Sequence, residues 1–156
     1  MKAKNHVQPT PHRSRSLPTL ALGLVLSSAV AGPPESAPSP VYEVRPIGWV
    51  RKADGRTTIV LDDRYRPGLL GVDALEAIWV LYWFDRNDTP EQRAILQVHP
   101  RGDPANPLRG VFATRAPVRP NLIALSRCRV LSVQGSVIEI DDIDAMADTP
   151  VLDIKP

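Results

Sequence analysis

The sequence has few of the residues and motifs that several functional classes require. One cysteine, Cys128, stands among 156 residues, so the chain forms no internal disulfide and offers no cysteine-based metal site. It contains no phosphate-binding P-loop, no glycine-rich dinucleotide motif, no zinc-ligand spacing and no nucleophile elbow. Strand-like segments do not alternate with long helices, which excludes a doubly wound α/β fold. The length suits one ordinary domain.

An excess of positive charge is also missing from most of the chain. Residues 1–40 carry four basic residues and one acidic residue, whereas residues 41–156 carry 15 basic and 16 acidic residues, a balance of −1. This balance gives no overall electrostatic attraction to nucleic acid, so only a local patch can provide one. Such a patch would consist of arginine, because 13 of those 15 basic residues are Arg.

No apolar run has the length of a comfortable membrane span. The candidate in the leader, residues 20–26, is short; Gly23 interrupts it and Pro18 limits it on its N-terminal side. With its basic start and the Ala-Val-Ala at 29–31, this leader predicts a secretory signal peptide over residues 1–31, followed by a Pro-rich linker over residues 32–40. The alternative is a mis-translated upstream region, with the true start near residue 41, and both readings stay open.

From residue 41 onward, short runs of β-branched and aromatic residues are separated by turn signals. The strands that this pattern predicts cover residues 47–50, 57–61, 78–84, 110–114, 122–133, 136–140 and 151–154. Residues 78–84 are the strongest apolar run, and we expect a strand buried on both faces there. Residues 89–92 (Thr-Pro-Glu-Gln) predict the start of a short helix that runs through Leu96. The predicted fold class is mainly β, a small closed or nearly closed β-barrel with one short helix.

Residues 110–121 combine two arginines, two prolines and an asparagine behind a short apolar run. Each proline fixes its own φ and restricts the residue before it, so the segment is a stiff loop. Arg115 and Arg119 on such a loop are suited to an anion, because guanidinium groups match carboxylate and phosphate. The alternative is a rigid connection whose arginines face water.

Other residues with functional chemistry have a structural alternative that we favour from position alone. Asp85 and Arg86 follow the apolar run and could contact a ligand, but a surface ion pair is the simpler interpretation. His99 is more typical of a solvated or structural residue than of a general base. Cys128 alternates with arginines and should point inward as a small hydrophobic residue. The acidic run 141–144 lacks a calcium-loop pattern and predicts a solvated turn, so no metal site is expected.

Several segments in combination are similar to a known family. These are Arg45-Pro46-Ile47-Gly48, Gly68-Leu69-Leu70-Gly71, Trp83-Phe84, Gly110 to Arg115, Arg119-Pro120-Asn121 and Thr149 to Pro156. Together they resemble the TrmO (TsaA-like, YaeB-like) family of S-adenosylmethionine-dependent tRNA methyltransferases. The segments Asp85 to Pro90 and Leu96 to Gly102 resemble its short, single-domain branch. The resemblance covers residues 41–156, the expected TsaA-like β-barrel domain.

The resemblance implies a homodimeric barrel that binds S-adenosylmethionine and methylates the N6 amine of threonylcarbamoyladenosine beside the tRNA anticodon, in the cytoplasm. The positions that match the family's cofactor contacts are Asp85, Arg86, Arg115, Leu125, Ala145, Met146, Ala147 and Asp148. Arg115 suits the cofactor's carboxylate, Asp85 its ribose diol or ammonium, and the backbone of residues 145–148 its adenine. Arg119, Asn121 and Lys155 are candidates for contact with tRNA, and no residue stands out as the catalytic base.

Three departures from the family pattern bear on activity. The Pro-Arg-Gln motif of longer members is replaced by the turn at residues 52–55, and the family's Asp-Gly-Thr-Pro reads Ala147-Asp148-Thr149-Pro150. The sequence also ends at Pro156, where family members normally continue. A competing hypothesis is therefore a non-catalytic β-barrel binding module, exported through the signal-like leader, that keeps the fold without the reaction.

Overall fold

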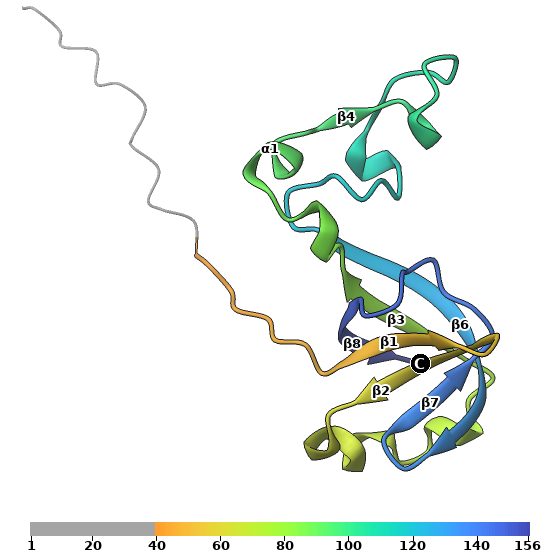
Figure 1. The fold of residues 1–156 in the computed structure, drawn as a ribbon. Helices are drawn as coiled ribbons and strands as arrows, with labels where there is room; N and C mark the ends of the chain where they lie inside the picture. The colour runs from red at the N-terminus through yellow and green to blue at the C-terminus, as the bar shows by residue number, and fades with distance from the viewer. Residues whose placement is uncertain (1–39) are drawn as a thin grey trace, which may run out of the picture. The chain divides into compact units, whose positions relative to one another are not determined.

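The computed structural model describes residues 40–156 (Figure 1). The predicted signal peptide and all but the last residue of the predicted linker lie outside the described residues. Residues 41–156 form one compact unit. Among the described residues, no helix is long and apolar enough to cross a membrane.

Six antiparallel strands of the described chain close into a barrel (Figure 1). They are β1 (Gly48–Ala53), β2 (Arg56–Leu61), β3 (Ala77–Trp83), β6 (Ile123–Gln134), β7 (Val137–Ile140) and β8 (Pro150–Lys155). Their order around the barrel is β1-β2-β7-β6-β3-β8, and β8 pairs back onto β1. The closed sheet confirms the predicted β-barrel and leaves no long unpaired edge.

Alternation of side chains along each strand fills the barrel with β-branched residues. In β3, Ile78, Val80 and Tyr82 point into the core, while Trp79 and Trp83 on the other face are half-buried. The prediction of a strand buried on both faces was therefore wrong, because the outer face of β3 is not covered by another layer. The core residues that are at most 1% exposed include Val50, Ile59, Ile78, Val80, Ile138, Ile140 and Val151.

Residues 85–121, between β3 and β6, form an arm that stands away from one end of the barrel (Figure 1). The arm contains α1 (Pro90–Arg93), a short pair of strands β4 (Gln97–Val98) and β5 (Arg109–Gly110), and three 3-10 turns, η3 (Asp85–Asn87), η4 (Pro100–Gly102) and η5 (Val111–Ala113). Two further 3-10 turns, η1 (Asp63–Leu69) and η2 (Val72–Ala74), lie between β2 and β3.

Two predictions for the arm were wrong in extent. The helix begins as expected, with Thr89 Oγ1 accepting from the backbone of Gln92, but it ends at Arg93 instead of Leu96. The strand predicted over residues 110–114 covers only Arg109–Gly110, after which the chain turns into η5. The turn buries Val111, whose backbone N–H donates to the Leu96 carbonyl at 2.9 Å.

Candidate functional site

A cavity of about 220 Å³ opens where β3 ends and β6 begins, at the end of the barrel that carries the arm. Its walls come from four parts of the chain: the end of β3 with Phe84, the start of β6, the loop that carries Arg115 and Arg119, and Asp144. Antiparallel pairing of β3 with β6, which sets Tyr82 opposite Ala124, holds the first two walls in register. The cavity is therefore built on rigid strands and bordered by two loops.

Tyr82 is the most deeply buried polar side chain of this cavity. Its side chain is 3% exposed, and its hydroxyl donates to the Asp144 backbone carbonyl at 2.6 Å and lies 3.2 Å from Ser126 Oγ. Burial raises the pKa of Tyr82 and the Asp144 carboxylate raises it further, while the Ser126 hydrogen bond and Arg115 lower it. The phenol therefore stays neutral and fastens the segment around Asp144 to the barrel.

Arg115 and Arg119 lie on the same loop, residues 114–121, which we call the arginine loop, but they differ in their surroundings. Arg119 donates to three carbonyls, those of Val111, Ala116 and Thr114, at 2.8 to 3.1 Å. It thereby holds the curvature of its own loop. The exposed Arg115 lines the cavity, and among residues 40–156 its guanidinium has no hydrogen-bond or ion-pair partner.

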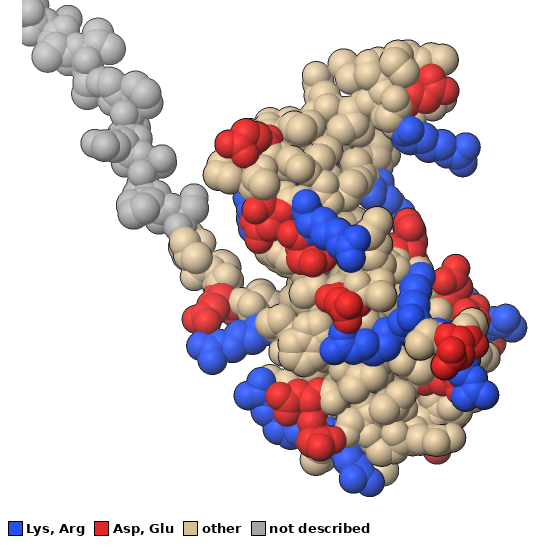
Figure 2. Space-filling model, viewed as in Figure 1, with Lys and Arg blue, Asp and Glu red and all other residues tan. Residues whose placement is uncertain are grey.

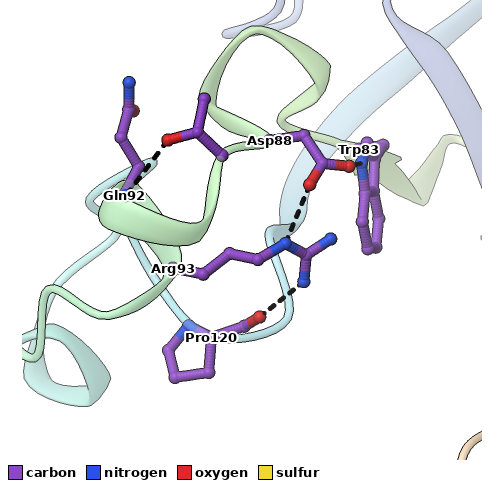
Figure 3. A network of polar contacts seen from close by, with 6 residues as sticks. Trp83, Asp88, Gln92, Arg93 and Pro120 are labelled. Atoms are coloured by element: carbon purple, nitrogen blue, oxygen red, sulfur yellow. Dashed lines mark hydrogen bonds and ion pairs between the residues drawn. The ribbon is translucent and has the colours of Figure 1, made fainter.

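The far end of the arginine loop is held by α1. Arg93 donates to the Pro120 carbonyl at 2.7 Å and to Asp88 at 2.8 Å, and its guanidinium lies 5.3 Å from the centre of the Trp83 ring (Figure 3). Hydrogen bonds from Arg93 and from Trp83 lower the pKa of Asp88. The arm and the end of β3 are thus fixed relative to the loop that carries Arg115.

Of the other predicted cofactor residues, Arg86, Met146 and Ala147 are brought together and Asp85 and Asp148 are not. Arg86 donates to Met146 Sδ and, at 3.5 Å, to the Ala147 carbonyl, which joins η3 to the segment 145–148. Asp148 is turned away and pairs with Arg51 of β1. Asp85 is exposed at the start of η3. Arg115 and Leu125 are the predicted cofactor residues that line the cavity itself.

The three tRNA candidates do not gather at one place. Arg119 lines the cavity with its donors directed to the loop, and Asn121 is exposed at the end of that loop. Lys155 lies on β8, forms an ion pair with Asp153 at 2.7 Å, and borders a different cavity of about 330 Å³. That cavity is larger but mostly apolar, so we place the candidate site at the smaller cavity, where charged groups converge.

Sequence reasoning missed Tyr82, Phe84, Ser126 and Asp144 as site residues. Alternation along β3 was the signal for an inward Tyr82, whereas Asp144 was hidden in an acidic run that is typical of a solvated turn. Among the described residues, no group of three or more His, Cys, Asp or Glu is placed to hold a metal ion.

Comparison with known proteins supports a relationship over the barrel and the arm. A probable S-adenosyl-L-methionine-binding protein of Methanocaldococcus jannaschii is 45% identical over 74% of this chain and 91% of its own length. A similarly named protein of Pyrococcus horikoshii is 44% identical over 73% of this chain and 81% of its own. The human tRNA (adenine(37)-N6)-methyltransferase is 40% identical, over 56% of this chain but 19% of its own length.

Solved structures show the same fold. A crystal structure of TrmO matches with a TM-score of 0.58 at 30% identity, and TrmO from Pseudomonas aeruginosa matches with 0.56 at 27% identity. This chain spans 57% and 55% of those chains, and they span 74% of this one. The tRNA-methyltransferase O N-terminal domain family matches residues 43–156. The barrel, the arm and these relatives together show that the chain belongs to the TrmO family, as a member of its N-terminal domain class.

Proposed function

We propose that this protein binds S-adenosylmethionine and transfers its methyl group to the N6 amine of threonylcarbamoyladenosine beside the anticodon of tRNA. The observation that carries the proposal is the convergence of predicted cofactor positions at one end of the barrel. Arg115 and Leu125 line the cavity there, and Arg86 holds Met146 and Ala147 beside it. The archaeal relative is named as an S-adenosyl-L-methionine-binding protein and the human relative as a tRNA (adenine(37)-N6)-methyltransferase, which supports the cofactor and methyl transfer to tRNA.

The chemistry of the cavity fits the cofactor. Arg115 offers a guanidinium for the carboxylate, Phe84 and Leu125 offer apolar surface, and the segment 145–148 offers backbone groups for adenine. The cavity volume of about 220 Å³ is smaller than that of typical ligand pockets, which start at roughly 300 Å³. In this proposal the cavity therefore holds part of the cofactor, and the rest of the cofactor lies along the neighbouring segments.

S-adenosylmethionine supplies a methyl group on a positively charged sulfur when it is bound. The protein's part is alignment: the cavity orients the donor, and the arginine loop positions the acceptor amine in line with it. Tyr82 remains a neutral hydrogen-bonding group because burial raises its pKa, so it orients a loop and is not a base.

Recognition of tRNA rests on local features, since residues 41–156 have a balance of −1. Basic and acidic side chains alternate over the visible face of the barrel (Figure 2). Asn121 is exposed at the end of the arginine loop, and it is the candidate for contact with a base or a phosphate near the proposed site of methyl transfer. Lys155 would contact RNA at a distance from the cavity. Arg119 lines the cavity and would contact RNA through Nη1, the guanidinium nitrogen that donates to none of the loop carbonyls.

The active form in this proposal is a homodimer. Ile95, Leu96, Leu108 and Phe112 of the arm are exposed, and Val111 is the one large hydrophobic residue of the arm that is fully buried. The arm's surface carries little charge over most of its visible face (Figure 2). A second copy that covers this surface would also enclose the cofactor more fully than a cavity of about 220 Å³ does.

The proposed site of action is the cytoplasm, where tRNA and the cofactor occur. The competing proposal, an exported binding module without activity, is favoured by two departures in the segment 145–148. Ala147 has no carboxylate, and Asp148 directs its carboxylate to Arg51.

Methyl transfer from labelled S-adenosylmethionine to tRNA that carries threonylcarbamoyladenosine tests the proposal. We expect label in the modified nucleoside with wild-type full-length protein, and a loss of at least about tenfold with Arg115→Ala, because one charge-assisted bidentate contact disappears. Cofactor binding without transfer to this tRNA would favour the binding module, and absence of cofactor binding would refute the methyltransferase and leave the binding module.

A further inference from the structure

Two side chains of opposite charge line the cavity without partners in the protein. Arg115 comes from the arginine loop and Asp144 from the segment between β7 and β8. Within residues 40–156, neither side chain has a hydrogen-bond or ion-pair partner, and they do not pair with each other. Tyr82 lines the same cavity of about 220 Å³, so both charged side chains face the small space around its hydroxyl.

Contacts with the barrel hold the Asp144 backbone in place, and this fixes the position from which its carboxylate faces the cavity. The Asp144 carbonyl accepts from Tyr82 at 2.6 Å. The preceding residue, Ile143, is buried in the core, and its carbonyl accepts from Lys52 Nζ at 2.9 Å. The side chain itself is exposed toward solvent and the cavity.

The other nearby carboxylates are committed elsewhere or do not line the cavity. Asp148 pairs with Arg51, and Asp85 lies outside the lining residues. Ala147 stands where the family pattern has an aspartate. Asp144 is therefore the carboxylate of the described chain that this cavity presents to a ligand.

A cation and an anion held apart in one small cavity match a ligand end that carries both charges. An α-amino acid has this form: a carboxylate for the guanidinium and an ammonium for the aspartate. The threonyl group of the proposed acceptor has a carboxylate but no ammonium, because its nitrogen is part of the carbamoyl linkage. The pair therefore discriminates in favour of the cofactor.

We propose that Asp144 binds the α-ammonium of the amino-acid end of S-adenosylmethionine while Arg115 binds the α-carboxylate. This assignment rests on the proposed function, and it gives Asp144 the role that the sequence resemblance had offered to Asp85. Ala147 has no carboxylate at the position where the family pattern has an aspartate, so Asp144 supplies the negative charge of the site.

The experiment is calorimetric titration of the full chain with three ligands: S-adenosylhomocysteine, 5′-methylthioadenosine, which lacks the amino-acid end, and L-methionine, which lacks the nucleoside. The variants are Asp144→Asn and, as a matched control, Asp142→Asn, which removes the same charge from the same segment outside the cavity. Thermal unfolding of each variant shows whether the fold is intact.

Asp144→Asn should weaken S-adenosylhomocysteine and L-methionine by about five- to tenfold and leave 5′-methylthioadenosine within about twofold of wild type. Asp142→Asn should change none of the three. Equal loss for all three ligands, or no loss for S-adenosylhomocysteine, would overturn the assignment even if the cofactor binds. Asp144-dependent binding of L-methionine without binding of S-adenosylhomocysteine or 5′-methylthioadenosine would instead uphold the charge pair and refute the proposed function; no binding of any of the three ligands would refute both.

Discussion

Asp148 adopts a left-handed backbone conformation with φ 68°, at the position where the family pattern has glycine. Its N–H donates to the Val50 carbonyl at 2.8 Å, so the conformation is fixed by pairing to β1. A residue with Cβ costs about 1–2 kcal/mol in this conformation, and Asp is among the residues that tolerate it best.

Replacement of Asp148 by Gly and by Ala separates this backbone cost from the ion pair with Arg51. Both variants lose the exposed pair, but only Ala retains Cβ, so Asp148→Gly should be more stable than Asp148→Ala by about 1 kcal/mol. Urea unfolding of the two proteins measures the difference. Equal stability would show that the left-handed backbone carries no cost here.

The Cys128 side chain is 1% exposed, and its buried thiol makes the free energy of unfolding depend on pH in the alkaline range. Burial, followed by the Asp141 and Asp142 carboxylates, raises the pKa of its thiol from 9.0 to about 11, and the opposing effect of Lys52 is smaller. Below pH 9 the thiol is neutral in both states. Between pH 9 and 11 the unfolded chain loses its proton first, so the free energy of unfolding should fall by up to about 2.7 kcal/mol.

The variant Cys128→Ala isolates this dependence. It should be less stable than wild type at pH 7 because of the cavity, yet its stability should change less between pH 9 and 10; Tyr82 is present in both proteins, so its titration contributes equally to both profiles. Unfolding curves in urea across this range provide the measurement. Parallel pH profiles for the two proteins would contradict the raised pKa of Cys128.

At the scale of elements, the arginine loop depends on Arg119. Three of its donors meet three loop carbonyls, and an ammonium cannot reproduce that planar arrangement. Arg119→Lys should therefore destabilise the protein by about 1–3 kcal/mol and weaken cofactor binding through Arg115.

A role for Arg119 in RNA binding alone gives a different result. In that case the free energy of unfolding stays unchanged, and Lys retains the salt dependence of tRNA affinity. Urea unfolding together with tRNA binding at two salt concentrations separates the two roles. Asn121→Ala, on the same loop, serves as the control that leaves the loop's carbonyl contacts in place.

The strands could be predicted from sequence because alternation is a local property. β2 follows from the run of β-branched residues Thr57 to Val60, and β3 from its aromatic and β-branched content, with Ile78 and Val80 at alternate positions. In the arm the start of α1 after Thr89 was predicted from its capping residues, but the 3-10 turns were not, since they have no periodic pattern. Of the residues that line the cavity, Arg115 was singled out by its stiff loop and by the resemblance, and Leu125 by the resemblance alone. Tyr82 was not, because it meets Asp144 across 62 residues, and that contact depends on closure of the barrel.

At the scale of the whole molecule, the exposed arm predicts association. Phe112 is 84% exposed, and burial of an aromatic side chain at an interface contributes about 2 kcal/mol or more to binding. Phe112→Asp should convert a dimer into a monomer in light scattering of the full chain.

Leu70→Asp is the matched control, because Leu70 is 96% exposed and lies between η1 and η2, outside the arm. It should leave the dimer intact. A wild-type monomer, or a dimer that both variants preserve, would contradict association through the arm.

Binding of S-adenosylmethionine to the full-length protein tests the central claim most directly, since family membership, the cavity and the charge pair all lead to it. Isothermal titration should give saturable binding with a dissociation constant in the micromolar range, lost or weakened at least about tenfold in Arg115→Ala. No heat of binding at millimolar ligand, or equal affinity in wild type and Arg115→Ala, would contradict the cavity as the cofactor site.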